Sequence, residues 1–160
     1  MENNATAHLT SAQDEYFMRR AISLAEQAAQ LGEVPVGAVI VRNGEVIAEA
    51  GNRRECDHRA TAHAELLAIE QACEAVGSWR LHDCTLYVTL EPCPMCAGAI
   101  VNARVGRVVF GCKDAKAGAM GSVLNLPSYP LNHRPICEWG VCENACREVL
   151  QNFFALRRRK

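Results

Sequence analysis

Three residues have the types and the spacing of ligands for a catalytic metal ion. Cys93 and Cys96 are separated by two residues, a spacing that lets two thiolates bind one ion, and His63 precedes them on a separate segment. Catalytic zinc sites use three protein ligands and leave the fourth tetrahedral position to water, whereas structural sites close all four. The pattern therefore predicts one Zn²⁺ ion per subunit, bound by His63, Cys93 and Cys96.

Glu65 lies two positions after His63. On an ideal helix the two side chains diverge by about 200°, so Glu65 need not bind the metal. It can instead accept a proton from a water whose pKa the zinc ion lowers to ~7. H-x-E followed by P-C-x-x-C is the general signature of zinc deaminases that act on nucleobases. We predict Glu65 as the catalytic acid/base. If Cys93 and Cys96 instead belonged to a closed structural zinc site, or were two buried thiols, the carboxylate near His63 would be unexplained.

Length and composition indicate one domain over residues 1–160. Of these residues 49% are hydrophobic and 22% are charged, as in an ordinary globular protein. Residues 1–10 are polar and lack the apolar stretch of a signal peptide, so we expect a disordered N-terminus and a cytoplasmic protein that makes no use of a membrane. The nine cysteines should then be reduced thiols or metal ligands.

Charge is distributed unevenly along the chain. Residues 1–100 carry 7 basic and 14 acidic side chains, whereas residues 101–160 carry 10 basic and 4 acidic ones. The basic C-terminal tail, residues 155–160, ends in Arg157-Arg158-Arg159-Lys160. Such segregation can form a nucleic-acid surface, but the tail taken alone fits better with a solvated helix end whose cations complement the helix dipole.

Hydrophobic spacing and turn residues predict alternating helices and strands. Residues 11–31 show the spacing of an amphipathic helix, with Thr10 or Ser11 as its cap, and Asn43-Gly44 indicates a hairpin between strands 36–41 and 45–50. Further along we expect helix 62–76, strand 85–90, helix 94–103, strand 107–111, a long loop over 113–141 and a last helix over 141–158. Helices between strands imply a parallel section of sheet, and the hairpin adds an antiparallel pair. The fold class is therefore α/β, with a mixed sheet between helix layers.

Five stretches carry a combination of residues that is typical of one enzyme family: residues 33–39, 61–65, 86–93, 96–99 and 114–116. They resemble the bacterial tRNA-specific adenosine deaminases, within the cytidine-deaminase-like superfamily, and the resemblance covers nearly the whole chain. It implies a three-layer α/β/α sandwich with a central mixed five-stranded sheet. It also implies hydrolytic deamination of adenosine to inosine at the wobble position of a tRNA anticodon, by a zinc-containing homodimer with no organic cofactor and the tRNA anticodon stem-loop as partner.

The resemblance also suggests substrate-binding residues. Asn52 matches a residue that contacts the target nucleotide, Val34 and Leu90 would line the base pocket, and Asp114 would lie near the flanking nucleotides. Phe154 and Arg157, on the last helix, would contact the RNA. The chain departs from the family pattern at Arg59-Ala60, where Asp-Pro is usual, and at Cys112, which replaces a small alanine.

Two other functions fit part of the pattern. A zinc deaminase of a free base or nucleotide, such as guanine, cytosine or deoxycytidylate, would use the same chemistry without needing the aromatic and basic last helix. A catalytically silent RNA-binding partner subunit would not need Glu65. Cys137, Cys142 and Cys146 could form a second metal site, but ordinary thiols fit better because no histidine follows them in the chain.

Overall fold

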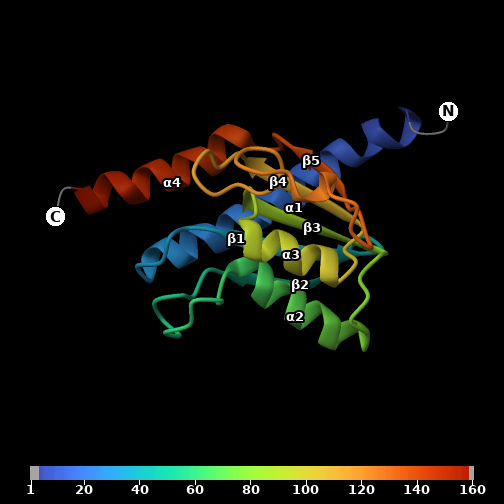
Figure 1. Ribbon diagram of the computed structural model, residues 1–160. Coiled ribbons are helices and arrows are strands. Elements are labelled where there is room, and N and C mark those ends of the chain that lie inside the picture. Colours follow the sequence, from blue (N-terminus) through green and yellow to red (C-terminus); the bar gives the residue numbers. More distant parts are fainter. Residues whose placement is uncertain (1–3, 159–160) are drawn as a thin grey trace.

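The computed structural model describes the backbone of residues 4–158 and the side chains of residues 12–158. Its centre is one five-stranded sheet in the order β2-β1-β3-β4-β5 (Figure 1). β1 runs antiparallel to both β2 and β3, whereas β3, β4 and β5 run parallel to one another. The predicted mixed five-stranded sheet is confirmed, and its strands are β1 (Gly37–Arg42), β2 (Glu45–Gly51), β3 (Cys84–Leu90), β4 (Arg107–Cys112) and β5 (Ile136–Trp139).

The predicted hairpin joins β1 to β2. Asn43 and Gly44 have φ angles of 52° and 78°, both in the left-handed region. A two-residue turn with two positive φ values matches the twist of the flanking strands, and Asn-Gly tolerates it best. The turn sets the register at the end of the hairpin, where Arg42 pairs with Glu45.

Helices cover both faces of the sheet. α2 (Ala64–Val76) and α3 (Pro94–Asn102) lie on one face, and α1 (Asn4–Gln30) and α4 (Glu143–Arg158) lie on the other (Figure 1). This arrangement confirms the three-layer α/β/α sandwich. Across residues 4–158, none of the helices combines the length and apolar character that a membrane crossing requires.

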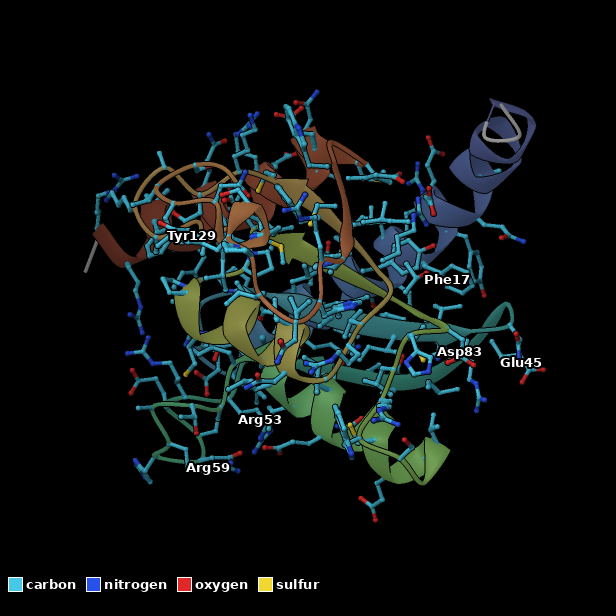
Figure 2. All side chains as sticks on the ribbon, turned by 45° about the vertical axis from the view of Figure 1, so that its right-hand side comes forward. Phe17, Glu45, Arg53, Arg59, Asp83 and Tyr129 are labelled. Atoms are coloured by element: carbon cyan, nitrogen blue, oxygen red, sulfur yellow. The ribbon has the colours of Figure 1, made fainter. Side chains whose placement is uncertain are left out.

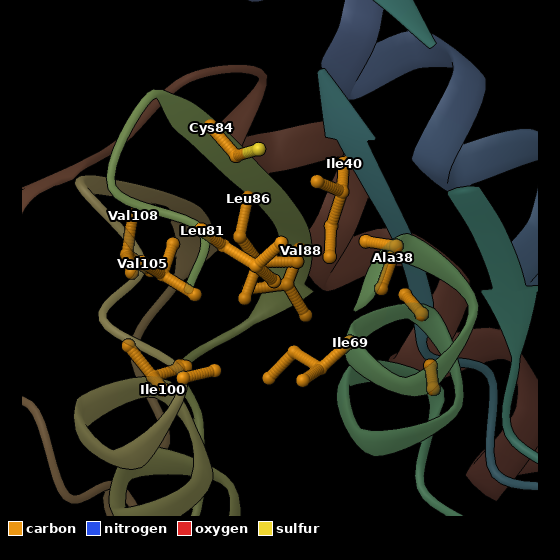
Figure 3. Packing of buried hydrophobic residues seen from close by; sticks show 14 of the residues in the cluster. Ala38, Ile40, Ile69, Leu81, Cys84, Leu86, Val88, Ile100, Val105 and Val108 are labelled. Atoms are coloured by element: carbon orange, nitrogen blue, oxygen red, sulfur yellow. The ribbon is translucent and has the colours of Figure 1, made fainter. Parts of the chain in front are cut away.

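Two apolar clusters hold the layers together, because successive side chains of a strand point to opposite faces of the sheet. Leu86 and Val88 of β3 face α2 and α3, where Ile69 and Ile100 point toward them (Figure 3). Tyr87 faces the other way, in the cluster with α1 and α4. Packing on both faces fixes α2 and α3 against the sheet, and these are the two helices whose first residues carry the predicted metal ligands.

The start of α1 differs from the prediction. We expected the helix to begin at Thr10 or Ser11, after a disordered segment, but the structure is helical from Asn4. Residues 4–10 contain neither glycine nor proline, so nothing in the backbone chemistry stops the helix from extending toward the N-terminus. Residues 1–3, and residues 159 and 160 of the basic tail, lie outside the described residues.

The segment from residue 113 to 141, predicted as one long loop, contains a short 3₁₀-helix (Leu126–Ser128) and β5. β5 has only four residues, all exposed, so it lacks the apolar alternation by which strands are recognised. Tertiary contacts define it instead: Arg107 of β4 forms an ion pair with Glu138 at 2.8 Å, and the Gly140 N–H donates to the Phe110 carbonyl at 3.0 Å. The extra strand widens the sheet beyond β4.

Candidate active site

The predicted metal ligands lie at the starts of two helices. His63 is the N-cap residue of α2, Cys93 is the N-cap residue of α3, and Cys96 lies in the first turn of α3. Pro94 at the first position of α3 suits a helix start, because that position needs no hydrogen-bonded N–H. The positive end of a helix dipole stabilises a thiolate, so the N-terminus of α3 favours ionised cysteine.

The three side chains meet at distances that suit a tetrahedral metal ion. His63 Nδ1 lies 3.7 Å from Cys93 Sγ and 3.5 Å from Cys96 Sγ. Zinc bond lengths of about 2.3 Å to sulfur and about 2.05 Å to nitrogen, at a tetrahedral angle, put those two atoms about 3.6 Å apart. Among the residues that the structure describes, this is the one group of three or more such side chains close enough to share an ion.

The protonation of the cluster is strongly coupled. The hydrogen bond from the Cys96 thiol, together with that from His63, lowers the pKa of Cys93 to about 4. The same bond to Cys93, together with burial, raises the pKa of Cys96 far above its ordinary value. Two adjacent thiolates need a cation between them, so loss of the Cys96 proton is coupled to binding of a divalent metal.

Glu65 is buried in the first turn of α2, with 4% of its surface exposed. Burial of the carboxyl group away from water is the largest influence on the pKa of Glu65, and that pKa is raised to about 6. A carboxyl group with a pKa near neutrality can both accept and donate a proton at working pH. The side chain lies outside the three-residue cluster, as expected for an acid/base beside a metal site.

His63, Glu65 and Cys93 share one pocket of about 220 Å³ with most of the predicted substrate-binding residues. This volume is below the roughly 300 Å³ at which pockets for drug-sized ligands begin, so the pocket suits a small planar group such as one base. The structure thus places four of the predicted substrate-binding residues beside the metal-ligand cluster: Val34, Asn52, Leu90 and Asp114. The other lining residues are Val36, Arg54, Ala64, Glu91 and Ala117.

Asn52 connects two walls of this pocket. Its Nδ2 donates to the Val34 carbonyl at 3.1 Å, and its Oδ1 accepts from the Arg54 N–H at 3.2 Å. These bonds hold the amide in one orientation while leaving it one further donor and acceptor position. These free positions of the Asn52 amide can contact a group in the pocket, as the predicted role of Asn52 in binding the target nucleotide requires.

Sequence reasoning missed Glu33, which holds the loop between β2 and α2. Its carboxylate is fully buried and accepts from the backbone N–H groups of Glu55 at 3.0 Å and Cys56 at 2.8 Å. Burial alone would raise the pKa of Glu33, but these two N–H groups hold it below its ordinary value. An acid between Gly32 and Val34 was the available signal, since buried carboxylates need partners.

Glu91 has the same role on the opposite wall and was also missed. It accepts from the N–H groups of Asp114 at 3.2 Å, Met120 at 3.0 Å and Ser122 at 3.1 Å, and from the Ser122 hydroxyl. Burial would raise the pKa of Glu91, but these donors hold it below its ordinary value. The carboxylate fixes the start of the loop that lines the pocket with Asp114 and Ala117.

Phe154 and Arg157 lie away from the pocket, on α4. They line a separate open hollow of about 460 Å³ together with Lys116, Arg147, Leu150, Gln151 and Arg158. Phe154 is 43% exposed, and an Arg157 N–H donates to the Gly32 carbonyl at 3.1 Å. Lys116 connects the two sites, because its neighbour Ala117 lines the pocket.

The remaining cysteines and the two departures from the family pattern stand apart from this chemistry. Burial raises the pKa of Cys112 to about 11 and that of Cys146 to about 12, as expected of inert thiols. Cys112 packs in the apolar cluster that the sheet forms with α1 and α4, and it does not line the pocket. Arg59 and Ala60 are exposed, and Figure 2 shows Arg59 at the outer end of the β2–α2 loop.

Zinc deaminases of nucleobases combine a histidine and two cysteines with a glutamate that does not bind the metal. The sheet and helix layers that hold these groups here are those of the cytidine-deaminase-like class, which is the class that fold and site define.

Comparison with known proteins narrows the class. The model of the MafB19-like deaminase family matches residues 12–158. The chain is 52% identical over 149 residues to the tRNA-specific adenosine deaminase of Bacillus subtilis (strain 168), covering 92% of each protein. The protein belongs to the MafB19-like deaminase family and to the tRNA-specific adenosine deaminases.

Solved structures of deaminases share the fold of this chain. One from a study of A-to-I editing by tRNA:A34 deaminases at the wobble position of transfer RNA superimposes with a TM-score of 0.82 at 46% identity, over 84% of this chain and 99% of that one. The guanine deaminase of Bacillus subtilis shares the fold with a TM-score of 0.61 at 36% identity, over 90% of this chain and 93% of that one.

Proposed function

We propose that the protein hydrolyses the amino group of adenosine at the wobble position of a tRNA anticodon and leaves inosine. The observation that carries the reaction class is the shared pocket of His63, Cys93 and the buried Glu65. The substrate follows from the relatives, whose names specify tRNA adenosine. The anticodon loop suits such a pocket because its bases are already unpaired, so one base can enter at low cost.

We propose His63, Cys93 and Cys96 as the ligands of one zinc ion. Their separations fit tetrahedral bond lengths, and one nitrogen with two sulfurs is a donor set that zinc accepts. Three ligands leave one coordination position for the reaction. A zinc ion bound there supplies an activated water at neutral pH.

Glu65 moves the protons in this proposal. Its carboxylate accepts a proton from the attacking water and donates it to N1 of the adenine ring as the new bond from oxygen to C6 forms. It then accepts the second proton, from the new hydroxyl group on C6, and donates it to the amino group as the C6–N bond breaks. Because Glu65 is buried, no bulk water competes for the transferred proton. One carboxyl group thus serves as base and then as acid, and ammonia leaves.

The pocket walls would select a base. Val34 and Leu90 offer apolar surface to a planar ring, while Asn52 offers the hydrogen-bond positions of its amide that its own bonds leave free. Asp114 stands at the start of the neighbouring loop, where a flanking nucleotide would pass. Its Oδ1 accepts from the N–H groups of Lys116 and Ala117, which gives this loop a fixed shape.

The hollow on α4 is the proposed RNA contact beyond the pocket. Arg157 and Lys116 supply positive charge for phosphates, and the exposed ring of Phe154 supplies a stacking surface. The hollow reaches the pocket through the 114–117 segment, so RNA lying along α4 would lead to the target base. A deaminase of a free base has no need of this surface.

We further propose that the protein works as a cytoplasmic homodimer. The family resemblance suggests the dimer, and four exposed apolar side chains in the segment after the pocket loop would be covered by it: Val123, Tyr129, Leu131 and Ile136. Light scattering of the purified protein tests this proposal, and a monomeric mass at working concentration would refute it.

The substrate assignment is tested by incubating the protein with an anticodon stem-loop that contains wobble adenosine, beside free adenosine, cytidine and guanine. Inosine in the stem-loop, read by mass, is expected. Product from guanine alone would favour the alternative that the 36% identical guanine deaminase represents. Binding of the stem-loop without any turnover would favour a silent RNA-binding subunit, against which the buried Glu65 already argues.

A further inference from the structure

A tryptophan that the site does not use stands exposed at the end of the edge strand. Trp139 closes β5, with 49% of its surface exposed. The ammonium group of Lys113 lies over the ring, 4.1 Å from its centroid. About half of this large aromatic residue therefore stays exposed to water, with a cation on the face of its ring.

Trp139 faces the same side of the sheet as the active site. It pairs with Phe110 of β4, and Phe110 belongs to the core cluster beneath α2 and α3. Residues directly paired in a sheet point to the same face. Ile136 lies an odd number of residues away on β5 and points to the opposite face, so the ring does not extend an apolar patch.

The ring is also near the pocket. Lys113 directly precedes Asp114, which lines the pocket, and β3 ends at the pocket with Leu90. β5 is two strands from β3, a separation of about 10 Å at the usual strand spacing. A nucleotide next to one bound in the pocket can reach a surface at this distance.

We propose that Trp139 and Lys113 form a stacking platform for a base that flanks the target adenosine in the RNA substrate. The inference rests on the proposed function and extends its RNA contacts to the edge of the sheet. A base on the indole displaces the ammonium group, which then pairs with a phosphate of the same strand. The ammonium group of Lys113 supplies positive charge at the ring itself, so this surface suits RNA better than an apolar protein partner.

Tryptophan fluorescence tests the contact directly, because the chain has only two tryptophans, Trp79 and Trp139. Trp79 is a matched control: it is 53% exposed and also lies under cations, Arg80 and Arg104. It follows the C-terminus of α2, and the 13 residues of that helix span about 20 Å from the end that bears His63.

Two variants in a Glu65→Ala background, which prevents turnover, isolate each ring. With Trp79→Phe, addition of the wobble-adenosine stem-loop should quench the emission of Trp139. With Trp139→Phe, the emission of Trp79 should stay unchanged. Equal quenching in both variants, or in neither, would overturn the platform.

Kinetics with altered RNA locate the stacked base. Trp139→Ala should raise KM for the stem-loop about tenfold, the effect expected of losing one base–aromatic stack, whereas Trp139→Phe and Trp79→Ala should stay within about threefold of wild type. An abasic site on the 5′ or the 3′ side of the target adenosine removes one flanking base at a time. When the base that stacks on Trp139 is the one removed, Trp139→Ala should cause no further rise in KM.

The outcomes separate the two proposals. No inosine from wild-type protein refutes the proposed function. Inosine formation with an unchanged KM in Trp139→Ala refutes the platform alone. A change of oligomeric mass in Trp139→Ala, with KM for RNA unaltered, would assign the ring to a subunit contact and equally overturn the inference.

Discussion

Replacing Glu33 by glutamine should loosen the active site without touching a catalytic group. The two carboxylate oxygens of Glu33 each accept one backbone N–H, from Glu55 and Cys56. In Glu33→Gln one oxygen becomes an NH₂ group that faces an N–H donor. The variant therefore loses one charge-assisted bond and buries an unpaired donor.

Loss of a hydrogen bond to a charged group costs about 1.5–3 kcal/mol. For a chain of this length each kcal/mol shifts the melting temperature by about 2–4 °C, so Tm should fall by about 3–12 °C. Calorimetry at pH 7 measures the shift. Glu55→Gln is the control, because it removes an exposed carboxylate from the same loop and should leave Tm within about 2 °C of wild type.

The pH dependence of stability tests whether the hydrogen bonds to the ionised Glu33 carboxylate cause the difference in Tm. Hydrogen bonds hold the pKa of Glu33 below its ordinary value of 4.5, so the unfolded chain takes up the proton first as the pH falls. The stabilisation is complete above the unfolded-state pKa near 4.5 and is lost as the pH falls through the lower folded-state pKa. The gap in stability between wild type and Glu33→Gln should narrow below about pH 4.5; a constant gap down to pH 3 would refute the reasoning.

Three other changes test separate parts of the account. Glu65→Ala should reduce turnover by at least about 10²–10⁴-fold while metal analysis still finds one zinc per chain, and retained activity would remove Glu65 from the mechanism. Arg157→Ala should weaken binding to the stem-loop and reduce the salt slope by about 1, whereas Arg80→Ala should do neither; equal slopes would make α4 a solvated helix. Gly118→Ala would place a Cβ against the Glu91 carboxyl group, so it should displace the pocket loop and raise KM several-fold. If KM and Tm both stayed at their wild-type values, this wall of the pocket would accommodate the methyl group without cost.

Local signals were enough to predict most of the fold. The hairpin at Asn43-Gly44 depends on two adjacent residues that tolerate positive φ, and helix α2 ends at Gly77 in the left-handed conformation that glycine favours. β5 could not be found in this way. It exists because Arg107 and Phe110 hold it from β4, and contacts between distant segments leave no periodic trace in four exposed residues.

The site divides in the same manner. Metal-ligand spacing is a property of a short motif, so the cluster of His63, Cys93 and Cys96 was visible in the sequence. The carboxylates of Glu33 and Glu91 act on backbone N–H groups more than 20 positions away, and any residue type can supply such a group. The sequence alone therefore could not show what holds the pocket walls.

We propose that the protein deaminates wobble adenosine in RNA by means of a zinc ion and Glu65. Mass analysis of an anticodon stem-loop after incubation with wild-type protein tests it most directly, before and after chelation and after return of zinc. We expect inosine at the wobble position, lost on chelation and restored by zinc, and none from free adenosine or guanine. Turnover that persists after complete metal removal, or product from free guanine alone, would contradict the account.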